Sequence, residues 1–173
     1  MRTLITKPTQ DEYAPYYQTY ISKIDSEYLM DILEKSRDAT LAFLTTMPAE
    51  KWDYRYQEDK WTIKEVLVHL MDVERIFTYR ALRFSRNDRT SVAGFDENEY
   101  IPESNTSERT VESILAEYVA LRQSTIQFFK NINSEMSLRT GIANGKEISV
   151  RALGFIIPGH EMHHINVIRE RYF

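Results

Sequence analysis

Gly159-His160-Glu161-Met162-His163-His164 contains three of the four histidines in the chain, and the fourth is His69. His160 and His164 are four residues apart, a spacing that places two side chains on one face of a helix. Imidazole is a common protein ligand for zinc, nickel, copper and iron. The sequence therefore predicts a metal site to which one helix contributes His160 and His164 and a second helix contributes His69.

The two imidazoles fall in the middle of an apolar helix face. At about 100° per residue, they point in the same direction as the large aliphatic side chains of the segment. These are Leu153, Ile156, Ile157, Val167 and Ile168. A buried polar ring costs about 1–3 kcal/mol unless its nitrogens find partners, and a bound cation would satisfy both rings. The alternative is a pair of core histidines bonded to tyrosine, aspartate or backbone carbonyls. We favour the metal, and we expect His163, at the edge of this face, to lie beside the ligands or at the surface.

Composition indicates one globular domain spanning residues 1–173. Hydrophobic residues make up 42% of the chain and charged residues 28%, which is sufficient for a sizeable core. The net charge of −4 provides no basic surface, so nucleic acid is not an expected partner. There are no cysteines, which excludes disulfides, thiolate metal sites and a cysteine nucleophile. No run of about 18 apolar residues and no signal-peptide pattern is present, so we expect a cytoplasmic protein with no membrane partner.

Few helix-breaking residues interrupt the chain, with only 5 Gly and 5 Pro, and this favours long helices. Apolar residues recur at helical spacing in four segments, and Thr62, Thr110 and Ser149 are suitable N-cap residues for three of them. Thr62 with Glu65 also matches a capping box. The predicted helices run from residue 27 to about 46, from 63 to about 85, from 111 to between 131 and 133, and from 150 to 171.

The remaining segments are predicted to be connections or an arm. Residues 8–24 contain four tyrosines and are expected to form an irregular arm whose rings pack on the body. Residues 86–109 form a long polar connection, either a binding loop or a plain surface link, and Asp96 and Glu97 within it are weak ligand or base candidates. Asn144-Gly145 predicts a small hairpin.

A proline lies inside the last predicted helix. Pro158 removes a backbone hydrogen bond to Gly154 and favours a kink one turn before His160. Such a bend would either aim the histidines or bow the helix around the core. Together, the segments predict an all-α fold, a four-helix bundle with an N-terminal arm, short links and one long inter-helix connection. Bundles of this kind often hold metals between facing helices.

Two carboxylates flank His69 along its helix. Glu65 lies one turn before it and Asp72 about one turn after it. Either could accept a hydrogen bond from the free imidazole N–H and fix which nitrogen faces a metal. The alternative is that both are solvent-facing charges that pair with Arg75 or Lys64.

The segment from His160 to His164 also matches the H-E-x-x-H pattern of zinc proteases. Proteolysis is disfavoured, because a protease needs a strand edge to align a peptide and this chain offers few strands. Glu161 nevertheless lies beside the two predicted ligands. We therefore predict Glu161 as a catalytic residue that takes a proton from a metal-bound water.

Several motifs together resemble the DinB superfamily, in the branch that includes YfiT-like metal-dependent hydrolases and bacillithiol transferases. The similarity spans nearly the whole chain. The motifs are Lys60-Trp61-Thr62-Ile63-Lys64-Glu65-Val66-Leu67-Val68-His69-Leu70, Glu74-Arg75-Ile76-Phe77, Tyr79-Arg80-Ala81-Leu82-Arg83-Phe84, Gly94-Phe95-Asp96-Glu97, Ser149-Val150-Arg151-Ala152-Leu153, Gly159-His160-Glu161 and Arg169-Glu170-Arg171-Tyr172.

This resemblance implies a four-helix bundle, often homodimeric, with a three-histidine site for one divalent transition metal, zinc or nickel being expected. Carried over by position, the ligands are His69, His160 and His164. Related proteins transfer a low-molecular-weight thiol to an electrophile, and others have no assigned reaction. No set of residues identifies the thiol as bacillithiol, mycothiol or glutathione.

The sequence therefore predicts a metal-dependent enzyme with a small-molecule substrate, which activates either a thiol for S-transfer or a water for hydrolysis. The alternative is a non-catalytic bundle that binds a metal or another ligand. Coordination distinguishes the two hypotheses. A catalytic metal keeps an open position, whereas a structural metal would be closed by a fourth protein ligand such as Asp72 or Asp96.

Overall fold

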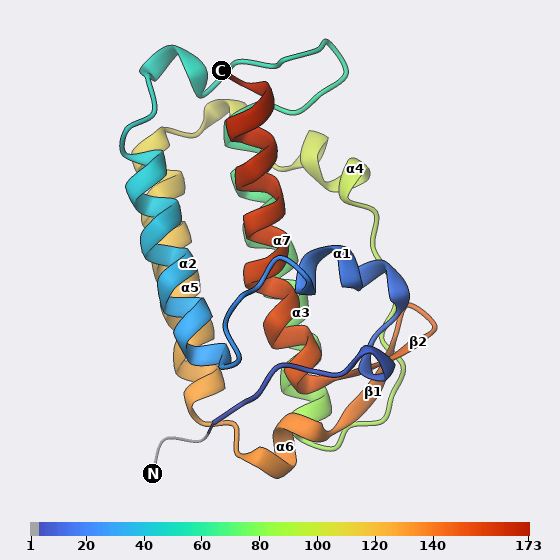
Figure 1. Ribbon diagram of the computed structural model, residues 1–173. Helices are drawn as coiled ribbons and strands as arrows, with labels where there is room; N and C mark the ends of the chain where they lie inside the picture. Colours follow the sequence, from blue (N-terminus) through green and yellow to red (C-terminus); the bar gives the residue numbers. More distant parts are fainter. Residues whose placement is uncertain (1–3) are drawn as a thin grey trace.

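Four long helices lie side by side along roughly parallel axes (Figure 1). They are α2 (Leu29–Leu44), α3 (Ile63–Ser85), α5 (Val111–Lys130) and α7 (Val150–Arg171). The computed structural model describes residues 4–173, so the first three residues of the expected domain lie outside the described part. The predicted all-α four-helix bundle is confirmed. No helix in residues 4–173 is both long and apolar enough to cross a membrane.

The histidine-bearing helices are direct neighbours. α3 packs most extensively against α7 and also against α5, while α2 packs against α5 and α7. Following the chain in Figure 1, α2 and α7 run upward and α3 and α5 run downward, so α3 and α7 are antiparallel. α2 and α3 are not principal packing partners although they follow one another in the chain, and the link between them crosses one end of the bundle.

Local hydrogen bonds explain where the helices begin. The Thr62 side chain accepts from the backbone N–H of Glu65 at 3.1 Å, and the Glu65 carboxylate accepts from the backbone N–H of Thr62 at 2.7 Å. This capping box was predicted, and Thr110 and Ser149 also cap their helices as expected. The first long helix begins later than predicted, because Tyr28 is extended and pairs with Thr6 in a β-bridge.

The links are longer than the short turns that were expected. Residues 45–62 and 131–149 join the helices on either side of them, in addition to the long connection before α5. The links contain η3 (Ala49–Lys51), α4 (Glu97–Tyr100), η4 (Ile101–Glu103), η5 (Thr106–Glu108) and α6 (Ser134–Leu138). The predicted hairpin is present as β1 (Thr140–Ala143) antiparallel to β2 (Lys146–Ser149). Its turn residues Asn144 and Gly145 have φ of 50° and 71°, the left-handed values that such a turn requires.

The N-terminal arm lies across α7 (Figure 1). It consists of η1 (Gln10–Glu12), η2 (Pro15–Tyr17) and α1 (Gln18–Ile21). α7 continues through Pro158 without interruption. The next residue, Gly159, is in close contact with the arm, because a Cβ at this position would lie 2.5 Å from the carbonyl oxygen of Tyr20. The glycine therefore allows the arm to lie directly on α7, beside His160.

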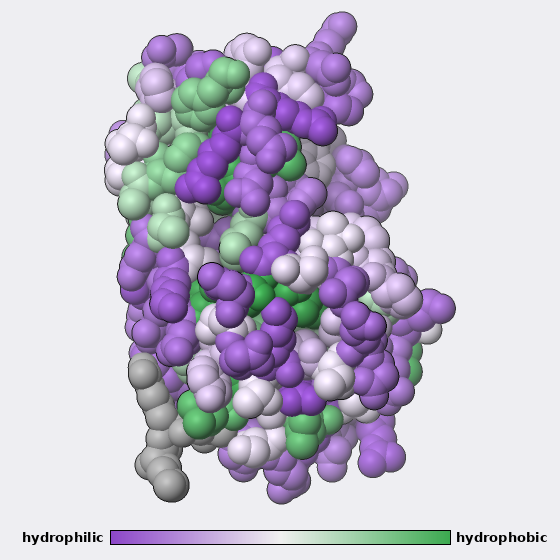
Figure 2. All heavy atoms as spheres, viewed as in Figure 1, coloured by the Kyte–Doolittle hydropathy of each residue, from purple (hydrophilic) through white to green (hydrophobic). Residues whose placement is uncertain are grey.

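Two clusters of buried apolar side chains fill the bundle, one towards each end. On α7, the first cluster includes residues up to Ile157 and the second begins at Ile165. The residues between them include His160, Glu161 and His164. Polar side chains therefore form a layer across the middle of the core. On the face shown in Figure 2, hydrophilic side chains cover most of the surface.

Candidate metal centre

Three imidazoles from two helices converge in the polar layer. The Nε2 atom of His160 lies 3.2 Å from Nε2 of His69 and 3.1 Å from Nε2 of His164. The candidate ligand atoms of the three residues all lie within 4.8 Å of one another. The i, i+4 spacing on α7 and the antiparallel packing of α3 explain this convergence. The structure thus brings together the three histidines that the sequence singled out.

This nitrogen set fits a cation better than it fits hydrogen bonds. Nε2 of His160 carries either one hydrogen or one lone pair, so it cannot form good hydrogen bonds to both of its neighbours. Two ligands about 2.1 Å from one ion are about 3.4 Å apart at a tetrahedral angle and about 3.0 Å apart at a right angle. The separations of 3.1 and 3.2 Å lie between these values. A divalent transition metal therefore fits the residues present.

The histidines are held in their neutral form. Burial lowers the pKa of His69 to about 4. Burial, together with the neighbouring His69, lowers the pKa of His164 to about 3. The pKa of His160, which is also buried, lies well below its ordinary value because of burial and the adjacent imidazoles of His164 and His69. Neutral imidazole is the form that binds metals, so near neutral pH the cluster needs to lose no proton before binding.

Aromatic rings surround the cluster. The indole of Trp61 lies 4.8 Å from the ring of His69, and the ring of Tyr20 lies 5.1 Å from that of His160. His163 is half-buried, outside the group of three, and its ring contacts the ring of His164 at 5.1 Å. Its place beside the cluster matches the expectation for this residue.

The carboxylates on either side of His69 have other partners. Glu65 caps α3 and pairs with Arg55 at 2.9 Å. Asp72 pairs with Arg75, as the alternative hypothesis expected, at 3.4 Å. Within residues 4–173, neither carboxylate is hydrogen-bonded to His69. The contacts therefore favour charge pairing over positioning of the imidazole.

Glu161 points into a second polar group, not towards solvent. It is buried, and its Oε1 accepts a hydrogen bond from the Tyr118 hydroxyl at 2.5 Å. Its Oε2 accepts from Nη2 of Arg122 at 2.6 Å. Because both oxygens are engaged, these contacts do not support Glu161 as a general base, and that role stays a prediction.

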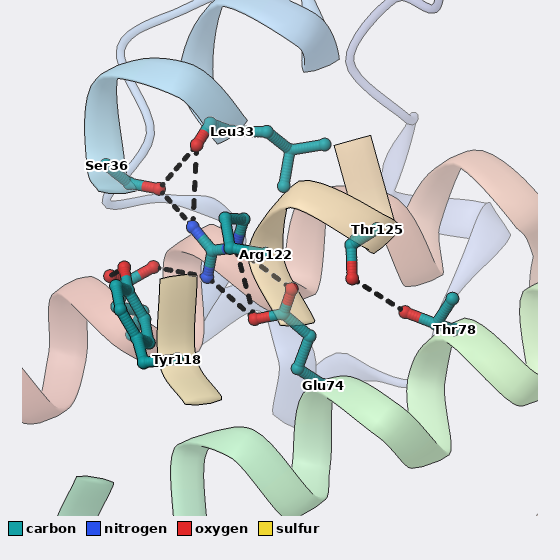
Figure 3. A network of polar contacts seen from close by, with 8 residues as sticks. Leu33, Ser36, Glu74, Thr78, Tyr118, Arg122 and Thr125 are labelled. Atoms are coloured by element: carbon teal, nitrogen blue, oxygen red, sulfur yellow. Dashed lines mark hydrogen bonds and ion pairs between the residues drawn. The ribbon is translucent and has the colours of Figure 1, made fainter. Parts of the chain in front are cut away.

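Arg122 is the centre of this buried network (Figure 3). In addition to Glu161, it donates to Glu74 at 2.9 Å and to the hydroxyl of Ser36 at 2.8 Å. The network ties together α2, α3, α5 and α7. This network was not predicted from the sequence, although Arg122 lies four residues from both Tyr118 and Ile126 on the apolar face of its helix. A cation in that position is the signal that could have revealed a buried ion pair.

Two cavities border the histidine cluster. A cavity of about 280 Å³ is lined by His69 and His160, and another of about 360 Å³ is lined by His164 and His163. The first cavity is also lined by Gly94, Phe95 and Glu97 from the long connection and by the arm tyrosines Tyr16, Tyr17 and Tyr20. The connection therefore forms part of a cavity wall. Tyr20 is also buried, so this arm residue both packs on the body and lines the cavity.

Comparisons with known proteins agree with this architecture. A family model described as the DinB superfamily matches residues 32–168. Among solved structures, YfiT from Bacillus subtilis, described as a probable metal-dependent hydrolase with an unusual four-helix bundle topology, is similar with a TM-score of 0.70. The two chains are 17% identical, and the similarity covers 95% of this chain and 90% of YfiT. A comparison with curated proteins finds no match.

Proposed function

Since this chain belongs to the DinB superfamily, we propose that it is a metal-dependent enzyme acting on small molecules at the site formed by His69, His160 and His164. Its proposed reaction is transfer of a low-molecular-weight thiol to an electrophile, and hydrolysis is the second candidate. The expected metal is one zinc or nickel ion per chain. The homodimer implied by the resemblance also stays a prediction.

The observation that carries the proposal is the composition of the cluster. It contains three histidines, and neither Asp72 nor Asp96 belongs to it. Asp72 pairs with Arg75, and Asp96 caps α4 by accepting from the backbone N–H of Asn98 at 2.9 Å. Three protein ligands leave coordination positions open for a substrate, whereas structural zinc sites usually have four.

The protein supplies the neutral nitrogens and the enclosure. When bound, a divalent ion would lower the pKa of a thiol or water placed beside it and stabilise the resulting anion. The rings of Trp61 and Tyr20 restrict the orientations of His69 and His160 and keep bulk water from their outer faces. The protein thereby keeps the ligand geometry ready for binding.

The two cavities favour transfer over hydrolysis. Transfer requires a thiol and an electrophile to meet, and the cluster is bordered by one cavity at His69 and His160 and by another at His164. Hydrolysis requires only one organic substrate, because the other reactant is water. We therefore propose that the two reactants approach from these two cavities. Hydrolysis remains the second candidate, because YfiT is described as a probable metal-dependent hydrolase.

Metal content and activity test the proposal together. The wild type and the His160→Ala and His163→Ala variants are stripped of metal, resupplied with zinc or nickel, desalted and measured by elemental analysis. We expect about one ion per chain in the wild type and in His163→Ala, and none in His160→Ala. The metal-loaded wild type is then assayed with small thiols and a nitro-activated aryl chloride, from which the thiolate displaces chloride as the C–S bond forms. Equal metal content in all three proteins would contradict the proposed site.

A further inference from the structure

Arg80 lines the first cavity together with His69 and His160, and it lies eleven residues after His69 on α3. His69, Val73, Phe77 and Arg80 follow one another along one face of α3, and all four line this cavity. A separation of eleven residues corresponds to about 16 Å along a helix axis, and side chains lean towards the N-terminus of their helix. The long Arg80 side chain is therefore expected to lean back towards His69.

The Arg80 guanidinium is buried without a carboxylate partner. Arg80 is 2% exposed, and its Nη2 donates a hydrogen bond to the carbonyl oxygen of Ala93 at 2.9 Å. The group lies 5.5 Å from the ring of Phe77 and 5.7 Å from that of Phe95. Its Nε is the one buried side-chain polar atom in residues 4–173 that lacks a hydrogen-bond partner.

The other fully buried arginine has a different environment. Arg122 is 1% exposed and pairs with both Glu74 and Glu161. Burial would lower the pKa of Arg122, but these two carboxylates raise it well above its ordinary value. Burial lowers the pKa of Arg80, and only the hydroxyl of Tyr17 opposes this effect. The charge of Arg122 is thus neutralised by carboxylates of the protein, whereas that of Arg80 is not.

A buried charge without a counter-charge is unfavourable by several kcal/mol, and proteins usually pair such groups. Arg80 lacks an anion and lines a cavity that also reaches two of the candidate metal ligands. We propose that Arg80 binds an anionic group of the substrate, a carboxylate or a phosphate, while the reacting end of the same molecule lies at His69 and His160. The assignment of this anion to the substrate rests on the proposed function, whereas the anion site itself does not.

The cavity further limits the chemistry of this ligand. Guanidinium presents a planar set of donors that matches carboxylate and phosphate oxygens. Between Arg80 and the histidines the wall is formed by Val73 and Phe77, so the middle of the ligand is expected to be apolar. Glu97 is half-buried, lines the same cavity and forms no ion pair with Arg80 among the described residues. Its negative charge favours a ligand with a single anionic group over a polyanion.

Titration with small anions tests the site directly. Uniformly ¹⁵N-labelled protein, as purified and again after metal removal, is titrated with butyrate, with inorganic phosphate and with neutral butyramide at constant ionic strength. The Nε–H signal of Arg80 is the reporter, identified by its absence in Arg80→Gln. We expect saturable shifts with butyrate or phosphate in both preparations and none with butyramide. The anion that binds more tightly identifies the group.

Matched variants separate recognition from general charge effects. By calorimetric titration of the same anions, we expect Arg80→Gln to weaken binding at least tenfold and Arg83→Gln, a nearby arginine on α3, to change it less than twofold. Equal anion affinity in Arg80→Gln and the wild type would overturn the inference. So would anion binding that is lost when the metal is removed from the wild type. Failure to bind metal with anion binding intact would instead contradict the proposed function.

Thermal stability distinguishes a binding role from a structural one. If Arg80 has no anionic partner in the absence of ligand, its removal should not destabilise the fold. The melting temperature of Arg80→Met should then be no lower than that of the wild type in buffer without butyrate or phosphate. Saturating anion should raise the melting temperature of the wild type and leave Arg80→Met unchanged. Arg80→Lys, which keeps the charge, provides a second folded variant and should show a reduced shift. A large drop in melting temperature in Arg80→Met, with the anion-induced shift unchanged in Arg80→Lys, would contradict the proposal.

Discussion

Arg122 of α5 donates to Oε2 of Glu161 of α7 at 2.6 Å, in the interior of the bundle. Glu161 directly follows the candidate ligand His160. The ion pair therefore fixes the backbone of α7 at the level of the histidine cluster. Through Glu74, Arg122 also holds α3, the helix that carries His69. The network thus connects both ligand-bearing helices behind the site.

Removal of Arg122 should destabilise the fold strongly. In Arg122→Met, the carboxylates of Glu74 and Glu161 would remain buried without their cation. Breaking a buried ion pair from one side typically costs about 3–5 kcal/mol. The free energy of unfolding in urea measures the loss. Arg75→Met is the control, because Arg75 is exposed and surface ion pairs are worth about 0–1 kcal/mol. Equal stability of the two variants would contradict the structural role of Arg122.

Glu161→Gln separates the network role from general-base catalysis. The amide keeps the size of the side chain but loses the charge that faces Arg122, so we expect a loss of about 1–3 kcal/mol in stability. Zinc stoichiometry should stay near that of the wild type, because Glu161 is outside the histidine cluster. A general base would behave differently, with turnover falling steeply while the urea midpoint stayed unchanged.

The sequence predicted the local parts of this site and missed the long-range ones. His160 and His164 could be paired because helical spacing alone places them together. His69 was added because it is the remaining histidine and lies in a helical segment. Arg122 and Arg80 were missed because their partners come from other helices or from the long connection. The length of the links was also missed, because apolar periodicity defines helices and not the paths between them.

Removal of the metal should lower the free energy of unfolding by an amount that increases with the logarithm of the metal affinity. If zinc is present at about 100 times its dissociation constant, binding adds about 2.7 kcal/mol to the free energy of unfolding. Thermal melts of the zinc-loaded wild type should therefore shift downward when a chelator is added. His164→Ala should melt at the same temperature with and without the chelator. A chelator-induced shift of equal size in His164→Ala would place the ion elsewhere.

The arm should lose an anchor in acid. Burial would raise the pKa of Glu12, but hydrogen bonds from Arg151, Thr9 and Ser149 outweigh it and lower the pKa from 4.5 to about 2. Because the folded-state pKa is depressed, this stabilisation is complete above about pH 4.5 and is lost as the pH falls towards 2. The contribution is on the order of 2 kcal/mol.

Urea unfolding between pH 2 and pH 7 measures this contribution. The difference in stability between the wild type and Glu12→Gln should be constant near neutral pH and should disappear towards pH 2. Glu50→Gln, at an exposed position, is the control and should follow the wild type throughout. A difference that grows with acidification would have the wrong sign for this ion pair.

Gly159→Ala should displace the arm from α7. The added Cβ would meet the carbonyl oxygen of Tyr20 at 2.5 Å, so the backbone must move. Overpacking of this kind typically costs about 1–3 kcal/mol. Trypsin cleavage after Lys23 should become faster, and limited proteolysis followed by mass spectrometry measures this. Asn166→Ala, exposed on the same helix, should be cleaved at the wild-type rate.

The N-terminal arm, which packs on α7 at Gly159, lies outside the segment matched by the family model, residues 32–168. Yet Tyr16, Tyr17 and Tyr20 line the cavity beside the cluster. The histidines and the part of the cavity wall formed by the arm therefore belong to separable parts of the chain. Exchange of the first two dozen residues between members of the superfamily could redirect substrate preference while leaving the chemistry of the centre intact.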